Sequence, residues 1–70
     1  MKAYQFNEST GLYEGEIFED GATLPYINGV TTIAPPEYRA GQVPVFDTTA
    51  QQWELLPVAI ARQLVLGRNQ

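Results

Sequence analysis

Cysteine and histidine are absent from this 70-residue sequence, and only four residues are basic. The lack of cysteine excludes disulfides, and the two absences together exclude the usual zinc sites and iron–sulfur clusters. No glycine-rich phosphate loop and no nucleophile–base pair is recognisable either. We therefore predict no metal, no cofactor and no catalytic residues, and we expect the chain not to be an enzyme.

The small size of the chain limits its stability. A domain this short buries only about 60% of the surface that its unfolded form exposes, and its core rarely supplies more than about 3–5 kcal/mol. The largest apolar side chains are four tyrosines, three phenylalanines and one tryptophan. Because no disulfide or metal can add to them, we expect association with other copies or with a larger protein.

Charge and hydropathy exclude two classes of partner. The net charge is −4, and the four basic residues, Lys2, Arg39, Arg62 and Arg68, are scattered along the chain. Binding to nucleic acid phosphates needs a clustered basic surface. The most apolar segment, 55–66, is too short and too polar to span a bilayer, and the start has no signal-peptide run. We expect no nucleic acid, no membrane, and synthesis in the cytoplasm.

One phrase occurs twice in the sequence. FNESTGLYE, residues 6–14, and FDTTAQQWE, residues 46–54, each place an aromatic residue before Asn or Asp and a second aromatic seven positions later. This spacing suits a β-hairpin whose loop lies between the two rings, which then form a cross-strand pair. We therefore predict two hairpins that share an aromatic core.

In the first copy, Asn7 begins the turn and Gly11 takes the positive φ that glycine adopts without steric cost. Phe6 then lies opposite Tyr13. In a regular ladder Tyr4 shares the face of these two rings. Three polar side chains occupy the other face: Gln5, Glu14 and Glu16.

In the second copy, Asp47 begins the turn, 48–51 form the loop and Phe46 faces Trp53. The glycine is missing, which predicts a loop of another type. Pro44 has no amide hydrogen, so its strand lies at a sheet edge or is just beginning.

The fold class predicted is mostly β, a small single domain over 1–70. Hairpin 1 covers about 3–18, a connector 19–41, hairpin 2 about 42–57, and a C-terminal tail 58–70. Within the connector, Leu24-Pro25-Tyr26 is expected to be extended and Pro35-Pro36 to adopt polyproline II geometry. The tail fits a short helix or an irregular segment, and Gly67 is a natural helix stop. A strand over 58–66 is the remaining alternative, in which Arg62 would share the apolar face.

Five residues are candidates for contact with a partner or a glycan: Tyr26, Pro35, Pro36, Tyr38 and Trp53. Pro35 to Tyr38 match the PPxY ligand of WW domains. A stiff connector whose Tyr38 packs on its own domain is the favoured interpretation, because so short a motif arises easily by chance. Trp53 with a neighbouring tyrosine would suit a platform for a sugar ring. A core position is favoured for Trp53 because so small a domain needs its largest apolar side chain inside. Tyr26 and Tyr38 lie in loops, and we expect these two rings to be exposed.

The order of several short motifs resembles small modules of tailed-phage genomes, which occur beside or within tail fibre proteins and fibre assembly proteins. The resemblance covers about residues 4–57. The matching residues are Tyr4, Phe6, Asn7, Thr10, Gly11, Tyr13, Gly15, Glu16, Leu24, Pro25, Thr31 to Pro36, Gly41, Gln42, Val45, Phe46, Asp47 and Trp53. After Trp53 the chain departs from the Asp-His-Arg-Gly-like continuation of those modules, which favours a small accessory protein.

The resemblance implies a phage or prophage protein that serves a tail structure by protein–protein binding. Its implied partner is a tail fibre or another tail protein, and a homo-oligomer is a second expectation. Its implied location is the bacterial host cytoplasm, with incorporation into the virion as an extension. The alternative is a small carbohydrate-binding module whose exposed aromatics recognise the host surface.

Overall fold

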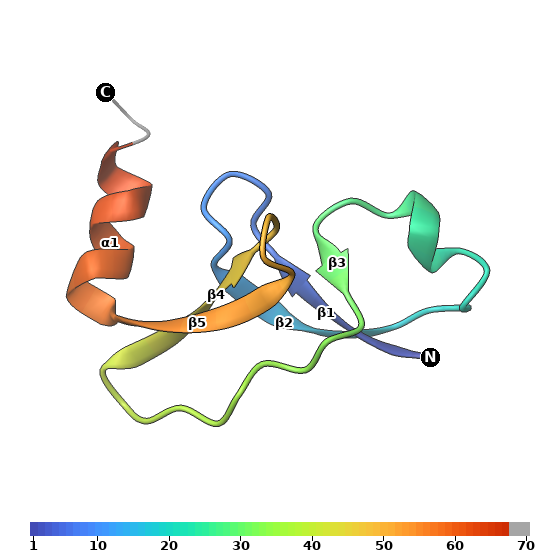
Figure 1. The fold of residues 1–70 in the computed structure, drawn as a ribbon, viewed down its shortest axis with the longest axis horizontal. Coiled ribbons are helices and arrows are strands. Elements are labelled where there is room, and N and C mark those ends of the chain that lie inside the picture. Colours follow the sequence, from blue (N-terminus) through green and yellow to red (C-terminus); the bar gives the residue numbers. More distant parts are fainter. Residues whose placement is uncertain (68–70) are drawn as a thin grey trace.

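The computed structural model describes residues 1–67, and it consists mainly of strands (Figure 1). The elements are β1 (Lys2–Phe6), β2 (Tyr13–Phe18), the 3-10 helix η1 (Leu24–Tyr26), β3 (Val30–Thr31), β4 (Gln42–Asp47), β5 (Gln52–Pro57) and α1 (Val58–Gly67). They form two antiparallel sheets, of order β2-β1-β3 and β4-β5. The prediction of a mostly β fold with two hairpins is confirmed.

The tail, for which the sequence left a helix, an irregular segment or a strand open, forms the helix α1. Its good helix formers and the absence of proline after Pro57 allow this. The last part of the predicted tail, 68–70, lies outside the described residues.

The first hairpin loop forms as predicted. The Asn7 side-chain oxygen accepts hydrogen bonds from the amides of Ser9 and Thr10, at 2.9 and 3.0 Å. The Gly11 amide donates to the Asn7 carbonyl, and Gly11 has φ of 81°. Phe6 lies opposite Tyr13, so the aromatic pair is in the expected register.

Beyond this pair the regular register is wrong, because β2 contains a bulge. Gln5 pairs with Gly15, so Glu14 is the extra residue, and Gly15 has φ of 130°. The bulge brings Glu16 opposite Tyr4, on the face that carries the aromatic pair. Glu14 and Glu16 therefore do not form the regular outward pair expected from alternation, since one inserted residue exchanges the two faces of a strand.

The second loop copies the first, and the expectation of another loop type is wrong. The Asp47 carboxylate accepts hydrogen bonds from the amides of Thr49 and Ala50. Gln51, which stands where the first loop has its glycine, takes φ of 55°. Its side-chain amide donates to the Thr48 carbonyl at 2.7 Å, and this bond holds a residue in a conformation that usually costs about 1–2 kcal/mol.

The two hairpins are joined where the first loop meets β4. The Phe46 amide donates to the Gly11 carbonyl at 2.8 Å, and Leu12 forms an isolated bridge with Val45. A Cβ atom on Gly11 would lie 2.6 Å from the Phe46 carbonyl oxygen. Only glycine therefore allows the loop to approach β4 this closely. Figure 1 shows the two hairpins crossing at this point, with α1 beyond one end and η1 beyond the other.

The connector is more ordered than an extended chain. Leu24 to Tyr26 form the helix η1, and the expectation that they are extended is wrong. Asp20 nucleates the turn by accepting hydrogen bonds from the amides of Ala22 and Thr23, and the fixed φ of Pro25 suits the first turn of a helix. The Phe6 amide then donates a hydrogen bond to the Gly29 carbonyl at 2.8 Å, which attaches β3 to β1.

The core is an aromatic cluster between the two sheets. Phe6 stacks on Phe46 with ring centres 4.8 Å apart, and Trp53 meets Phe46, Tyr13 and Phe6 edge-on at 5.0, 5.5 and 6.3 Å. Both predicted aromatic pairs therefore meet in one cluster. The fully buried Pro44 lies on β4, whose two-stranded sheet has only edge strands.

Candidate binding surfaces

Trp53 lies half-buried in the aromatic cluster rather than open on a sheet face. Its indole N–H donates to the Ile33 carbonyl at 2.7 Å. A Trp indole that is packed on one side and hydrogen-bonded at its edge commonly serves to hold a fold together. Trp53 thus fixes the connector just before Pro35, and these contacts favour the core role over the sugar platform.

The other four candidates are in the connector, and three of them are exposed. Tyr26 is 86% exposed and Tyr38 is 48% exposed. Pro36 is exposed and Pro35 is half-buried, in a segment that has no regular secondary structure. The aromatic rings expected on the surface are therefore there, and their contact with a partner stays a prediction.

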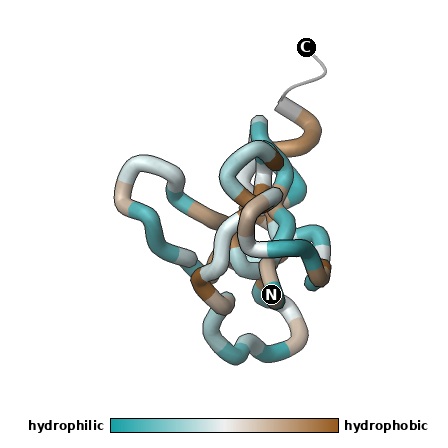
Figure 2. Tube along the Cα trace, turned by 90° about the vertical axis from the view of Figure 1, so that its right-hand side faces the viewer, coloured by the Kyte–Doolittle hydropathy of each residue, from teal (hydrophilic) through white to brown (hydrophobic). Residues whose placement is uncertain are grey.

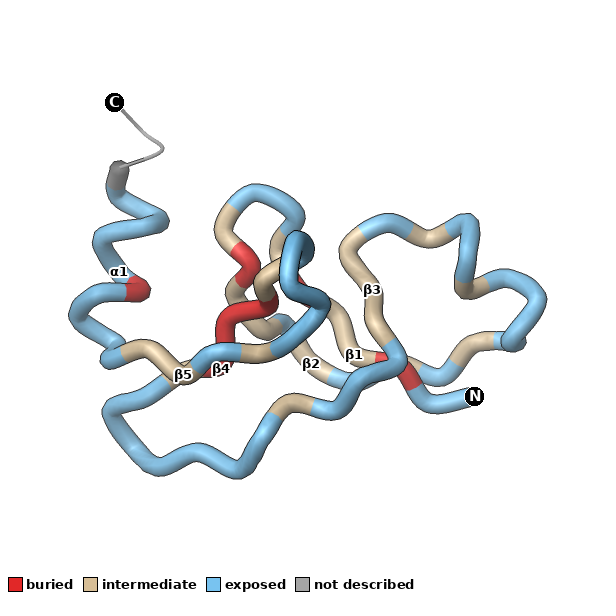
Figure 3. Tube along the Cα trace, in the orientation of Figure 1, coloured by how far each residue is buried: buried red, intermediate tan, exposed pale blue. Residues whose placement is uncertain are grey.

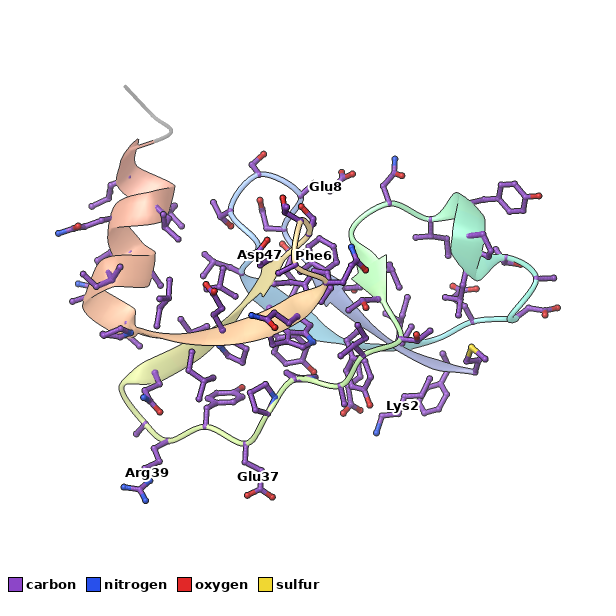
Figure 4. The ribbon with its side chains drawn as sticks, in the orientation of Figure 1. Lys2, Phe6, Glu8, Glu37, Arg39 and Asp47 are labelled. Atoms are coloured by element: carbon purple, nitrogen blue, oxygen red, sulfur yellow. The ribbon has the colours of Figure 1, made fainter. Side chains whose placement is uncertain are left out.

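The structure does not bring these two tyrosines together. Tyr26 belongs to η1, at one end of the molecule in Figure 1. Tyr38 is flanked by Glu37 and Arg39, whose side chains point away from the sheets at the opposite lower edge of Figure 4. One flat platform built from both tyrosines is therefore not formed.

A groove that the sequence analysis did not anticipate lies between α1 and the sheets. Its volume is about 430 Å³. Apolar side chains make up most of its lining, which comprises Leu12, Tyr13, Val43, Val58, Ala61, Arg62, Val65 and Leu66. Of these, Arg62 alone is charged. The sequence indicates only the apolar side chains, because a helix over 58–67 has far more of them than one packed face requires, and it does not indicate the hollow itself.

Helix α1 is mostly exposed although it is mostly apolar. Ala61, 5% exposed, is its one buried residue among those described, and Figure 3 shows a single red position on an otherwise exposed helix. Figure 2 shows hydrophobic colour at the end of the helix next to the C-terminal trace. The large side chains that remain 39–56% exposed are Val58, Ile60, Leu64, Val65 and Leu66.

At 100° per residue, these side chains cover an arc of roughly 240° around the helix, whereas a helix that packs on one core needs an apolar stripe of about 100°. Full burial of an aliphatic side chain is worth about 1.5–3 kcal/mol, so the exposed fractions represent roughly 3–7 kcal/mol of stabilisation that the chain alone does not realise.

The size of the molecule agrees with an open arrangement. The accessible surface is 4927 Å², roughly 500 Å² above the value expected for a compact protein of this mass. The Cα radius of gyration is 12.5 Å, against about 11 Å for a compact chain of this length. Both quantities indicate that the molecule is less compact than its length allows.

The charged groups on the bulged hairpin form a small network on the aromatic face. The Lys2 ammonium lies 3.3 Å from a Glu16 carboxylate oxygen and 5.9 Å from the centre of the Tyr4 ring. The hydrogen bond that Lys2 donates to Glu16, and the negative charge of Glu16, raise the pKa of Lys2. Burial, followed by the charge of Glu16, raises the pKa of the Tyr13 hydroxyl. The Lys2–Glu16 pair is exposed, and such pairs add little stability.

Residues 1–67 contain no group of three or more metal-ligating side chains. Within the same range, no helix is both long and apolar enough to cross a membrane.

A second, smaller depression of about 300 Å³ lies beside η1 and β3. Its lining mixes apolar groups with hydroxyl and amide groups, from Leu24, Pro25, Val30, Thr31, Thr32 and Gln51.

Comparison with known proteins gives no family model that matches the chain, no similar curated protein and no similar solved structure.

Proposed function

We propose that the chain is a non-enzymatic structural or assembly module of a phage or prophage tail, which binds a tail fibre or another tail protein. The resemblance over about residues 4–57 supports this function. Binding through the connector is the proposed mode of action, because the connector is exposed and displays Tyr26 and Tyr38 on a backbone fixed at several points. Tyrosine is enriched at protein–protein interfaces because its ring gives a large contact area at low entropic cost.

The fixed backbone is important for this proposal. The Trp53–Ile33 hydrogen bond and the bond between Gly29 and Phe6 attach the connector to the core at two separate places. A segment that is held in its binding conformation loses less conformational entropy when a partner binds. The connector therefore suits recognition of a second protein better than a free loop of the same composition.

The test is affinity co-purification of the tagged chain from its native host after prophage induction, with mass spectrometry of the captured proteins. We expect a fibre or baseplate subunit above the untagged control, and we expect Tyr26→Ser combined with Tyr38→Ser to abolish its capture. Phe18→Ser is the matched control, because Phe18 is an exposed aromatic residue (75%) on β2, outside the connector. Capture of no tail subunit, or equal capture by all three chains, would contradict the proposal.

A carbohydrate-binding function is the second candidate, and the depression beside η1 favours it. The depression is lined by Leu24 and Pro25 of η1, the hydroxyls of Thr31 and Thr32 and the amide of Gln51. The exposed Tyr26 is the last residue of the same helix, outside the lining. Sugar rings commonly stack on aromatic side chains and bind hydroxyl and amide groups. A glycan titration followed by the emission of the single tryptophan should give a saturable change that Tyr26→Ser removes. No change with host-surface glycans would exclude this function.

A further inference from the structure

We propose that the groove beside α1 is the interface of a homodimer, in which α1 of a second copy of this chain lies in the groove and packs against α1 of the first. The inference goes beyond the proposed function, because it needs no tail protein. It rests on the exposed apolar surface of α1, on the shape of the groove and on the distribution of charge.

The helix lacks a sufficient partner within its own chain. It is ten residues long, and isolated helices shorter than about 12–15 residues are marginal in water, so packing of an apolar face must stabilise it. Among the described side chains of α1, only Ala61 is buried. Val58, Ala61 and Val65 follow one another at spacings of three and four, and this spacing produces the stripe along which two helices pack.

The groove has the features that a two-fold interface requires. Such an interface uses the same patch on both copies, so the patch must offer both a hollow and the groups that fill it. Here Leu12 and Val43 from the hairpins line the hollow, and so do Val65 and Leu66 of the adjacent helix, which remain 44% and 56% exposed and can therefore enter the hollow of a second copy. One patch therefore supplies both halves of the contact.

Size and charge favour a second copy as the occupant. A standard interface buries about 600–1,000 Å² on each partner, and the accessible surface of this chain exceeds that of a compact monomer by roughly 500 Å². Two copies that each carry a net charge of −4 repel one another. This repulsion is smallest when the surfaces in contact carry no carboxylates. The lining of the groove contains no acidic residue, and its one charged side chain is Arg62. Its long aliphatic stem can cover apolar surface while its head stays in water.

Sedimentation equilibrium of the purified chain over a wide concentration range tests the proposal. We expect a reversible monomer–dimer equilibrium that Leu66→Glu weakens by about thirtyfold or more, the effect of losing one interface hot spot. Leu64→Glu is the matched control, since it makes the same change two residues away on a side chain that does not line the groove. Leucine and glutamate have similar helix propensities, so α1 itself should persist in both variants.

A second measurement covers the case in which Leu66→Glu fails to fold. Because the chain has no cysteine, Val65→Cys and Leu64→Cys each provide a single site for a short bifunctional thiol cross-linker. We expect cross-linked dimers from Val65→Cys and few from Leu64→Cys. A chain that is monomeric at every concentration would overturn the proposal, and so would a dimer that both glutamate variants weaken equally or both cysteine variants cross-link equally.

Discussion

The two hairpin loops share their hydrogen bonds but fill their left-handed position with different residues. Each loop begins with an Asn or Asp side chain that accepts two amide hydrogens. The position with positive φ is Gly11 in the first loop and Gln51 in the second. The first is pressed against β4, where a Cβ would lie 2.6 Å from the Phe46 carbonyl oxygen, whereas the second is exposed. The neighbouring strand, rather than the turn itself, makes glycine necessary.

The aromatic residues that follow the loops also differ, and they give the largest expected effect. Trp53 contacts three rings and the Ile33 carbonyl, whereas Tyr13 contacts only Trp53 among the aromatic pairs of the described residues. We expect Trp53→Ala to destabilise the domain by about 3–5 kcal/mol, which would unfold so small a protein. Tyr13→Ala should cost clearly less. Thermal melts followed by circular dichroism measure the loss of stability in both variants. Equal losses would show that Trp53 is not the central residue of the cluster.

The left-handed positions give the next largest effect, and they should respond in opposite directions. Gly11→Ala combines a strained φ with a backbone clash, so we expect a loss of about 2–4 kcal/mol. Gln51→Gly relieves the strain but loses a side-chain hydrogen bond, so we expect a gain of up to about 1 kcal/mol. Urea unfolding followed by tryptophan emission measures both free energies. Stabilisation by Gly11→Ala would disprove the close approach to β4.

The turn-starting residues should be nearly equivalent. Asn7→Ala and Asp47→Ala each remove one acceptor that two amides share, and loss of such local bonds costs about 1 kcal/mol. The first loop is more enclosed than the second, so Asn7→Ala should have the larger effect of the two. The same urea experiment measures the difference, and a larger loss for Asp47→Ala would reverse the comparison.

The smallest effect distinguishes the hairpins by pH. The pKa of Tyr13 is raised from its ordinary value of 10.0 by burial, so the folded state holds this proton more tightly than the unfolded state does. The resulting stability is complete below that value and is lost as the pH rises above it. Trp53 has no such group. Tyr13→Phe should therefore flatten the alkaline decline of stability, and an unchanged profile would refute the role of Tyr13.

Local features of this fold were predictable from the sequence. The two aromatic pairs and the turn at Asn7 follow from spacing and from side-chain chemistry that acts over a few residues. The bulge at Gly15 was not predictable, because a glycine within a strand is compatible with both a regular and a bulged ladder. The 3-10 turn at Leu24 to Tyr26 was missed because Pro25 fits extended chain and first-turn helix alike.

Features that depend on distant segments were not predictable. No residue near Leu12 in the sequence indicates its bridge to Val45. The loop that contains Gln51 was expected to differ because it lacks the glycine of the first loop, but Gly11 is required by the close approach to β4 and not by the turn. The exposure of Tyr26 and Tyr38 was expected from their loop positions. The groove beside α1 was not expected, because its formation depends on how the helix is placed relative to both hairpins.

The hydrogen bond between Gly11 and Phe46 has a consequence for how the chain folds. Each hairpin closes over a short loop and can form within about 1–10 μs. Joining the two hairpins closes a much longer loop of the chain, at an entropic cost of about 3 kcal/mol. This cost is offset only when the aromatic rings of the two hairpins pack together. Docking at Gly11 is then the slow step, so Val45→Ala, which weakens this junction, should slow refolding more than it speeds unfolding. A chevron plot in which only the unfolding arm moves would place the junction after the transition state.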